Sequence, residues 1–95
     1  MIEISYTYNR ITITGHANYA EHGKDIVCSA VSALTQTLIE SIETLTNDTI
    51  EYSISPGTVD IHYRNLSERA KLLVDSFFIG VQMIADEYKD YVQIL

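Results

Sequence analysis

The 95-residue chain has little or none of several features, and each shortage excludes a class of protein. It contains a single cysteine, so it cannot form an internal disulfide and must fold without a covalent cross-link. It has no apolar run near the ~18 to 20 residues that a membrane-spanning helix needs. Only six basic side chains oppose thirteen acidic ones, and the net charge of −7 repels a phosphate backbone. We therefore expect neither a membrane nor a nucleic acid as a direct partner.

The first ten residues, MIEISYTYNR, contain no basic segment that leads into an apolar stretch. We therefore expect neither a secretory signal nor a transit peptide, and we expect the chain in the cytoplasm. With 46% apolar and 20% charged residues, the composition is that of an ordinary globular protein. A chain of this length has room for one hydrophobic core, so residues 1–95 are expected to form a single domain.

Alternating apolar residues in the first part of the chain predict a pair of strands. Apolar and polar positions alternate over residues 2–8, and the same period of two recurs over 11–13. Asn9 and Arg10 lie between these runs, so a hairpin is the simplest connection. The segment 15–24, GHANYAEHGK, has no sustained periodicity and predicts a mobile surface loop.

The rest of the chain predicts two helices and a second hairpin. Apolar residues recur at steps of three and four in the stretch that follows Asp25, a natural N-cap, and this spacing predicts an amphipathic helix. Alternation over 50–54 and 59–63, with Ser-Pro-Gly-Thr between them, predicts two strands joined by a type II turn. Ser67 can cap a second helix, and the tail 91–95 can form a short final strand.

The expected order of elements is ββαββα, with or without the short C-terminal strand. Strands grouped as hairpins with helices between them predict an α+β fold, with two β-hairpins and two α-helices in a single compact domain. The second helix is apolar on more than one side. In so short a chain this indicates that a second subunit covers part of the helix, so we expect a homodimer.

Cys28 is the candidate for chemistry because it is expected as the third residue of the first helix. Unpaired backbone N–H groups and the helix dipole stabilise a thiolate at a helix N-terminus. The amide of Cys28 or of a neighbour could also donate to an oxyanion. Asp25, at the same helix end, opposes a thiolate unless the backbone or a histidine holds its carboxylate. The alternative is that Cys28 is a small buried residue without a chemical role.

Two loop histidines are candidates for the base. His16 and His22 lie twelve and six residues before Cys28, and spacing alone does not choose between them. A Cys–His pair also needs a third group that sets the imidazole tautomer, and Asp25 could serve. Alternatively, both histidines are ordinary surface residues and Asp25 is simply a helix cap. A zinc site built from these histidines, Cys28 and His62 would match no common ligand spacing.

The residues GHA at 15–17, Gly23 and the run DIVCSAVSAL over 25–34 resemble the signature of the ribosomal-processing cysteine protease family, Prp. The chain is similar to this family over its whole length and in its element order. The resemblance implies Cys28 as the nucleophile and chooses His16 as the base. It also implies a small cytoplasmic homodimer without a cofactor or a metal.

The same resemblance implies a substrate and further site residues. Family members remove the N-terminal extension of a large-subunit ribosomal protein, cutting an extended Asn-x-Gln-Phe-Phe peptide after the second Phe. Asp25 would orient the base or cap the helix, and Gly23 and Ser32 would contribute to substrate binding. The loop at 17–24 would close over the peptide. His22 is not part of the shared pattern.

Two other functions remain open from the residues alone. The chain could be a non-enzymatic, ribosome-associated module that binds a basic protein tail, with Cys28 as structural filler. A third reading is a redox sensor with one exposed thiol. Reactivity with iodoacetamide below pH 7 distinguishes an activated thiolate from a buried cysteine, because the buried thiol reacts only after unfolding.

Overall fold

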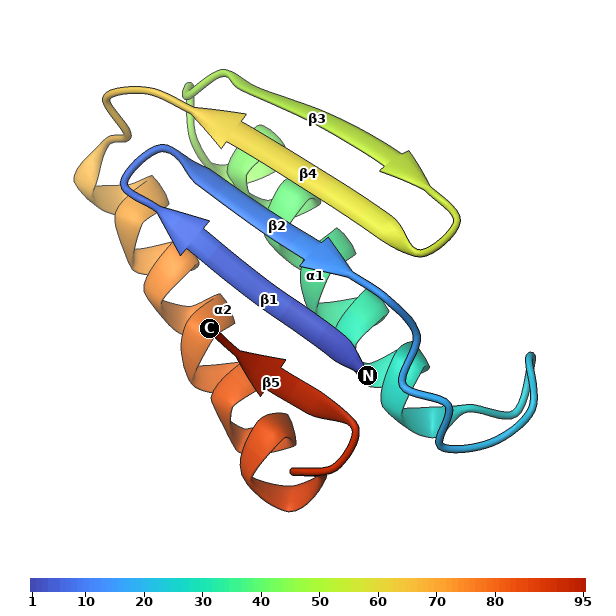
Figure 1. Cartoon of the computed structure of the whole chain (residues 1–95). Helices are drawn as coiled ribbons and strands as arrows, with labels where there is room; N and C mark the ends of the chain where they lie inside the picture. The colour runs from blue at the N-terminus through green and yellow to red at the C-terminus, as the bar shows by residue number, and fades with distance from the viewer.

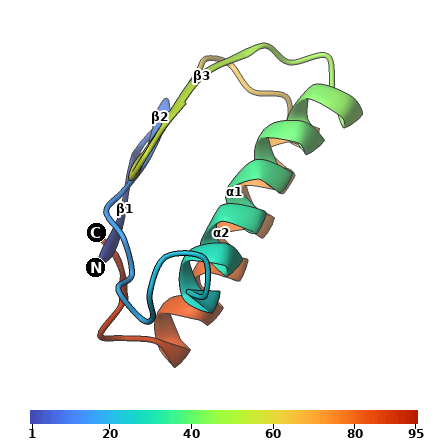
Figure 2. The same cartoon turned by 90° about the vertical axis from the view of Figure 1, so that its right-hand side faces the viewer.

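The computed structural model describes residues 1–95 and consists of one five-stranded sheet and two helices. Both helices cover the same face of the sheet, so the molecule has two layers (Figures 1 and 2). In chain order the elements are β1 (Ile2–Thr7), β2 (Arg10–Thr14), α1 (Ile26–Leu45), β3 (Ile50–Ser55), β4 (Thr58–Tyr63), α2 (Glu68–Glu87) and β5 (Val92–Ile94). The predicted α+β fold is confirmed, including its short final strand. Neither helix combines the length and the apolarity that a bilayer crossing requires.

The strands are ordered β3-β4-β2-β1-β5, and only the pair β1–β5 is parallel. The β1–β2 register pairs Thr7 with Arg10, which leaves a two-residue turn made of Tyr8 and Asn9. Tyr8 therefore lies outside the strand in which its alternating position placed it, and it is 93% exposed. The alternation of apolar and polar residues continues through Tyr8, but the two-residue turn needs Tyr8 as one of its members, so the strand ends at Thr7.

The second hairpin has the predicted turn. Ser55 pairs with Thr58, so Pro56 and Gly57 occupy the two central positions. Gly57 has a φ of +75°, the value that the third residue of a type II turn needs and that glycine adopts without strain. Antiparallel pairing of β2 with β4 joins this hairpin to the first one. The turn therefore lies at the same end of the sheet as the end of β2 (Figure 1).

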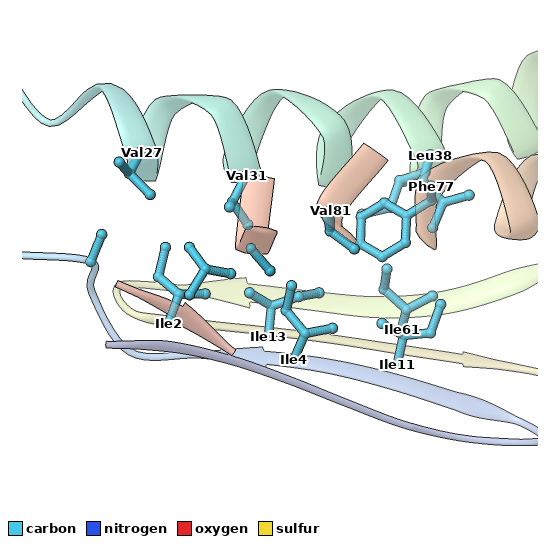
Figure 3. Close-up of a cluster of buried hydrophobic side chains, with 14 of the residues drawn as sticks. Ile2, Ile4, Ile11, Ile13, Val27, Val31, Leu38, Ile61, Phe77 and Val81 are labelled. Carbon is cyan, nitrogen blue, oxygen red and sulfur yellow. The ribbon is translucent and has the colours of Figure 1, made fainter. Parts of the chain in front are cut away.

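The hydrophobic core lies between the sheet and the helices (Figure 3). The largest side chains with less than 2% exposure come from both layers: Ile4, Ile11, Ile42, Ile61, Val27, Val81 and Thr35. Buried positions in α1 recur at steps of three and four, as the apolar pattern predicted. The hydroxyl of Thr35 donates to the Val31 carbonyl at 2.8 Å, so this buried polar group is satisfied.

An ion pair joins the two hairpins on the solvent-facing side of the sheet. Arg10 of β2 donates from Nε and Nη2 to the two carboxylate oxygens of Asp60 in β4, at 2.8 and 2.7 Å. These hydrogen bonds, together with the charges of Arg10 and His62, lower the pKa of Asp60 to about 2. The Arg10–Asp60 pair thus adds a polar contact between β2 and β4, which also pack through their buried side chains in the core.

We predict that Ile61→Ala lowers the free energy of unfolding by about 2 to 5 kcal/mol, because it removes buried methyl groups and leaves a cavity. Ile61 has an exposed fraction of 0%, whereas Ile54 on the neighbouring strand is 56% exposed. Ile54→Ala is therefore the matched control and should cost much less. Urea unfolding of the three proteins measures both differences, and equal losses would contradict this description of the core.

Candidate active site

The site lies where β2 runs into the loop at 15–25 and α1 begins (Figure 1). Gly15 leaves the strand with a φ of +91°, and its N–H donates to the carbonyl of Gly57 at 2.9 Å. A Cβ at position 15 would collide with the backbone oxygen of Met1, so only glycine fits here. This glycine turns the chain out of the sheet immediately before His16.

The carboxylate of Asp25 joins the loop to the helix. Its Oδ1 accepts hydrogen bonds from the N–H groups of Val27 and Cys28, at 3.0 and 2.9 Å. Its Oδ2 accepts from the N–H groups of Tyr19 and Ala20, at 3.0 and 3.5 Å. The residue is 8% exposed and is the N-cap of α1, as the sequence predicted.

These hydrogen bonds also determine the charge state of Asp25. The N–H of Cys28 most strongly, and those of Tyr19, Ala20 and Val27, lower the pKa of the carboxyl below its ordinary value, while burial acts in the opposite direction. The carboxylate is therefore ionised, with backbone amides around it. The sequence left open whether the backbone or a histidine holds the Asp25 carboxylate near Cys28. In the structure, backbone N–H groups hold it.

Cys28 is the third residue of α1 and is half-buried. Its Sγ accepts a hydrogen bond from the N–H of Ala17 at 3.3 Å. Ala17, the residue that follows His16, therefore contacts the sulfur through its backbone and is only 2% exposed. The contact was not predicted, because an alanine amide carries no sequence signal.

The first-turn amides of α1 are largely occupied. The N–H of Cys28 donates to Asp25 Oδ1, and the N–H of Ser29 donates to the Asp25 carbonyl at 3.1 Å. The expectation that the Cys28 amide serves an oxyanion therefore does not fit this geometry. The amide of Ala17 is the backbone donor that points at the sulfur.

The two candidate histidines have different surroundings. His16 is exposed, and the Nε2 edge of its ring faces Gly57 in the β3–β4 turn. A Cβ added to Gly57 would lie 2.9 Å from this Nε2. His22 is exposed in the outer part of the loop, next to the ion pair of Lys24 with Glu21. None of the hydrogen bonds that hold the loop involves His22. The structure brings the segment of His16 to Cys28, and it leaves the choice of base as a prediction.

The remaining predicted site residues make few contacts. Gly23 is exposed, and no atom lies within 4 Å of the position a Cβ would take there. Ser32 is exposed on α1, one helical turn after Cys28. Their contribution to substrate binding stays a prediction.

Aromatic packing holds the first half of the loop. The ring of Tyr19 contacts those of Tyr88 and Tyr91, with centroids 5.5 and 5.1 Å apart and interplanar angles of 82° and 78°. We call these three residues the tyrosine cluster. Together with the bonds of Asp25 it fixes residues 17–20, a segment that the sequence placed in one mobile loop. The cluster was missed, because Tyr19 lies far from Tyr88 and Tyr91 in the chain.

The structure contains no group of three or more His, Cys, Asp or Glu side chains that could hold a metal ion. His62, the fourth residue of the zinc alternative, lies on β4 with its Nε2 3.3 Å from Asp60 Oδ1. Its register partner is Arg10, at the opposite end of β2 from Gly15. The histidines are thus spread over different parts of the molecule.

A cysteine at a helix N-terminus, with a backbone donor on its sulfur, is typical of enzymes that use a thiolate nucleophile. The surroundings of Cys28 therefore indicate a thiol-dependent enzyme. Residues 1–93 match the family described as cysteine protease Prp. The chain belongs to this family and is a cysteine protease.

Individual relatives agree with this membership. A Bacillus subtilis protein named ribosomal processing cysteine protease Prp is 30% identical over 92 residues, covering 86% of this chain and 80% of the relative. The protein of the same name from Mycoplasma genitalium is 30% identical over 96 residues, covering 99% and 94%. A Staphylococcus aureus Prp crystal structure with a covalently linked product peptide has a TM-score of 0.89 at 23% identity, covering 98% and 94%, and shows the shared fold.

We predict that Asp25→Asn destabilises the protein in a pH-dependent way. Asparagine offers one oxygen instead of two and never ionises, so it cannot serve both the helix and the loop. Because folding lowers the pKa of Asp25 from 3.8, its stabilising contribution is complete above pH 3.8 and is lost as the pH falls through the lowered pKa. Thermal unfolding of both proteins across this range should show the difference in stability shrinking in acid. A difference independent of pH would contradict this account.

Proposed function

We propose that this chain is a cysteine endopeptidase that removes the N-terminal extension of a bacterial large-subunit ribosomal protein. Family membership supports the protease chemistry, and the names of the relatives support ribosomal processing. A covalently linked product peptide in the Staphylococcus aureus relative supports an extended peptide as substrate. The observation that carries the proposal is the hydrogen bond from the Ala17 N–H to Cys28 Sγ, which joins the histidine segment to the nucleophile.

In the proposed reaction, the Cys28 thiolate attacks the carbonyl carbon of the second Phe of a Phe-Phe pair. The C–N bond then breaks, and the protonated His16 gives its proton to the leaving amine. A water molecule then attacks the thioester carbonyl while His16 accepts one of its protons, and the C–S bond breaks. The product acid gives its remaining proton to solvent and leaves as a carboxylate. Cys28 is again a thiolate and His16 again protonated, so the cycle needs no cofactor.

The thiolate depends on few donors in this structure. The Ala17 N–H and the helix N-terminus stabilise negative charge on the sulfur. The nearby carboxylate of Asp25 opposes it, although four backbone amides accompany that carboxylate. A protonated His16 beside the sulfur would offset Asp25, and this need supports an ion pair of imidazolium and thiolate as the reactive state.

The surroundings of Cys28 suggest how the peptide is held. Residues 21–24, which include Gly23, form an exposed turn before α1, in which the Lys24 N–H donates to the Glu21 carbonyl at 3.0 Å. We assign closure over the peptide to this part and a substrate contact on α1 to Ser32. A basic ribosomal protein is attracted by the net charge of −7. Residues 1–95 act in this proposal as one protease domain in the cytoplasm, where the substrate is made.

Cleavage is tested by mass spectrometry of the extension-bearing ribosomal protein after incubation with this chain. We expect one cut after the paired phenylalanines and none with Cys28→Ala, which lacks the nucleophile. His16→Ala should slow cleavage by about 10²- to 10⁴-fold, because it removes general acid–base catalysis. His22→Ala is the matched control, since it removes an exposed loop imidazole, and it should cleave at the normal rate.

Other results would decide between the alternatives. Full activity of His16→Ala would show that His16 is not the base. Binding of the ribosomal protein without any cut, by a folded chain, would favour the non-enzymatic module that holds a basic protein tail. In that case Cys28 should also resist iodoacetamide below pH 7.

The proposal includes a homodimer, because one face of α2 is apolar and open to solvent. Leu72, Ile79 and Met83 are 68%, 66% and 68% exposed. Their spacing of seven and four residues places them along one side of the helix, away from the core positions Phe77 and Val81. A second copy of the chain would cover this apolar face.

We predict that Ile79→Glu weakens the dimer, because it would bury a charge in the subunit contact. Sedimentation analysis should show twice the chain mass for the wild type and a shift toward one chain mass for the variant. Gln36→Glu, which adds the same charge at an exposed position of α1, is the control. A wild type that sediments as one chain at all concentrations would rule out the dimer.

A further inference from the structure

Gly57 lies far from the site in sequence but contacts it in the fold. An ideal Cβ on Gly57 would lie 2.9 Å from Nε2 of the His16 ring, 3.5 Å from Cε1 and 3.6 Å from Cδ2. Real Cβ atoms essentially never approach other heavy atoms closer than 3.0 Å. The imidazole of His16 therefore occupies space that only a glycine at position 57 leaves open.

The same residue also fixes the backbone that leads to His16. The carbonyl of Gly57 accepts the hydrogen bond of the Gly15 N–H at 2.9 Å. Gly57 thus affects His16 in two ways. Its carbonyl holds the backbone that leads into His16, and its lack of a side chain leaves space for the imidazole ring. Both contacts depend on the β2–β4 register, which pairs Thr14 with Thr58.

We propose that Gly57 is a positioning residue for the imidazole of His16, and through it for the pair of His16 with Cys28. The inference rests on the proposed function in taking His16 as the base. Nε2 is at the far end of a side chain that can rotate, so an added Cβ would move the ring and leave the turn in place. The expected loss is therefore in the chemistry of Cys28 more than in the stability of the fold.

A simpler explanation of Gly57 must be separated from this one. The φ of +75° alone favours glycine, since other residues are strained there. A glycine required only for the turn would lower stability when substituted and would leave the reactivity of Cys28 unchanged. A positioning glycine would also change the pH at which the thiol reacts.

The test compares Gly57→Ala with Asn65→Ala. Asn65 also has a positive φ, +49°, and it follows β4 at the end of the sheet opposite to Gly15. Both variants place alanine in left-handed backbone, but only Gly57→Ala directs a Cβ at the imidazole. If Gly57→Ala does not fold, Gly57→Asn supplies the same Cβ in a residue that tolerates positive φ.

Three quantities are measured for each variant: the melting temperature, kcat and KM for the extension-bearing ribosomal protein, and the pH dependence of Cys28 alkylation by iodoacetamide. Both variants should melt at a lower temperature. Only the Gly57 variant should lose kcat, by on the order of 10²-fold, because a displaced catalytic group costs this much. Its alkylation profile should move to higher pH, because the displaced imidazolium no longer stabilises the thiolate.

The His16→Ala background completes the test. Adding Gly57→Ala to His16→Ala should lower kcat no further, because the ring that Gly57 positions is already gone. The inference would be overturned if the kcat losses of the two single variants multiplied in the double variant. It would also be overturned if Gly57→Ala had the same kcat and pH profile as Asn65→Ala. Either result would leave His16 as the base. Full activity of His16→Ala would overturn the base assignment and the role of Gly57 together.

Discussion

One buried carboxylate determines how the two parts of the site meet. Asp25 binds amides of the helix with one oxygen and amides of the loop with the other. With Oδ1 occupied by the helix, the loop follows a path that brings the amides of Tyr19 and Ala20 to Oδ2. That path places Ala17 on the sulfur of Cys28 and leads back through Gly15 to β2. A single side chain thus joins the loop that follows β2 to the helix that carries Cys28, and the tyrosine cluster adds to its effect.

This arrangement has an electrostatic cost at the nucleophile. A free helix N-terminus would offer its amides and its dipole to a thiolate, but Asp25 uses the amides of Val27 and Cys28 and adds a negative charge. The helix end therefore contributes geometry more than thiolate stabilisation. What remains for the sulfur is the helix dipole, which Asp25 opposes, the amide of Ala17 and any positive charge that approaches it. In the proposed mechanism, the imidazolium of His16 would therefore offset the charge of Asp25 in addition to transferring protons.

The parts of the structure that could be predicted are those in which neighbouring residues carry the signal. Periods of two and of three to four identified the elements, and the cap at Asp25 placed Cys28 at the third position of α1. Tyr8 shows the limit, because alternation does not indicate where a strand stops. The contacts of Ala17 with the sulfur and of Gly57 with the His16 ring depend on backbone groups, on absent atoms and on strand register. None of these has a signature in a single sequence, and neither has the parallel pairing of β1 with β5.

The pairing of β1 with β5 joins residues near the two ends of the chain, and the tyrosine cluster lies beside it. β5 is a strand of three residues at the end of the chain, and terminal segments fray at a low free-energy cost. This end of the chain is therefore a candidate for early local opening. Tyr91 directly precedes β5, and its carbonyl accepts a hydrogen bond from the Ile2 N–H at 2.8 Å, so opening of this end of the chain would weaken the packing of Tyr91 against Tyr19. The C-terminal end of the chain is thereby linked to the order of the loop that precedes the nucleophile.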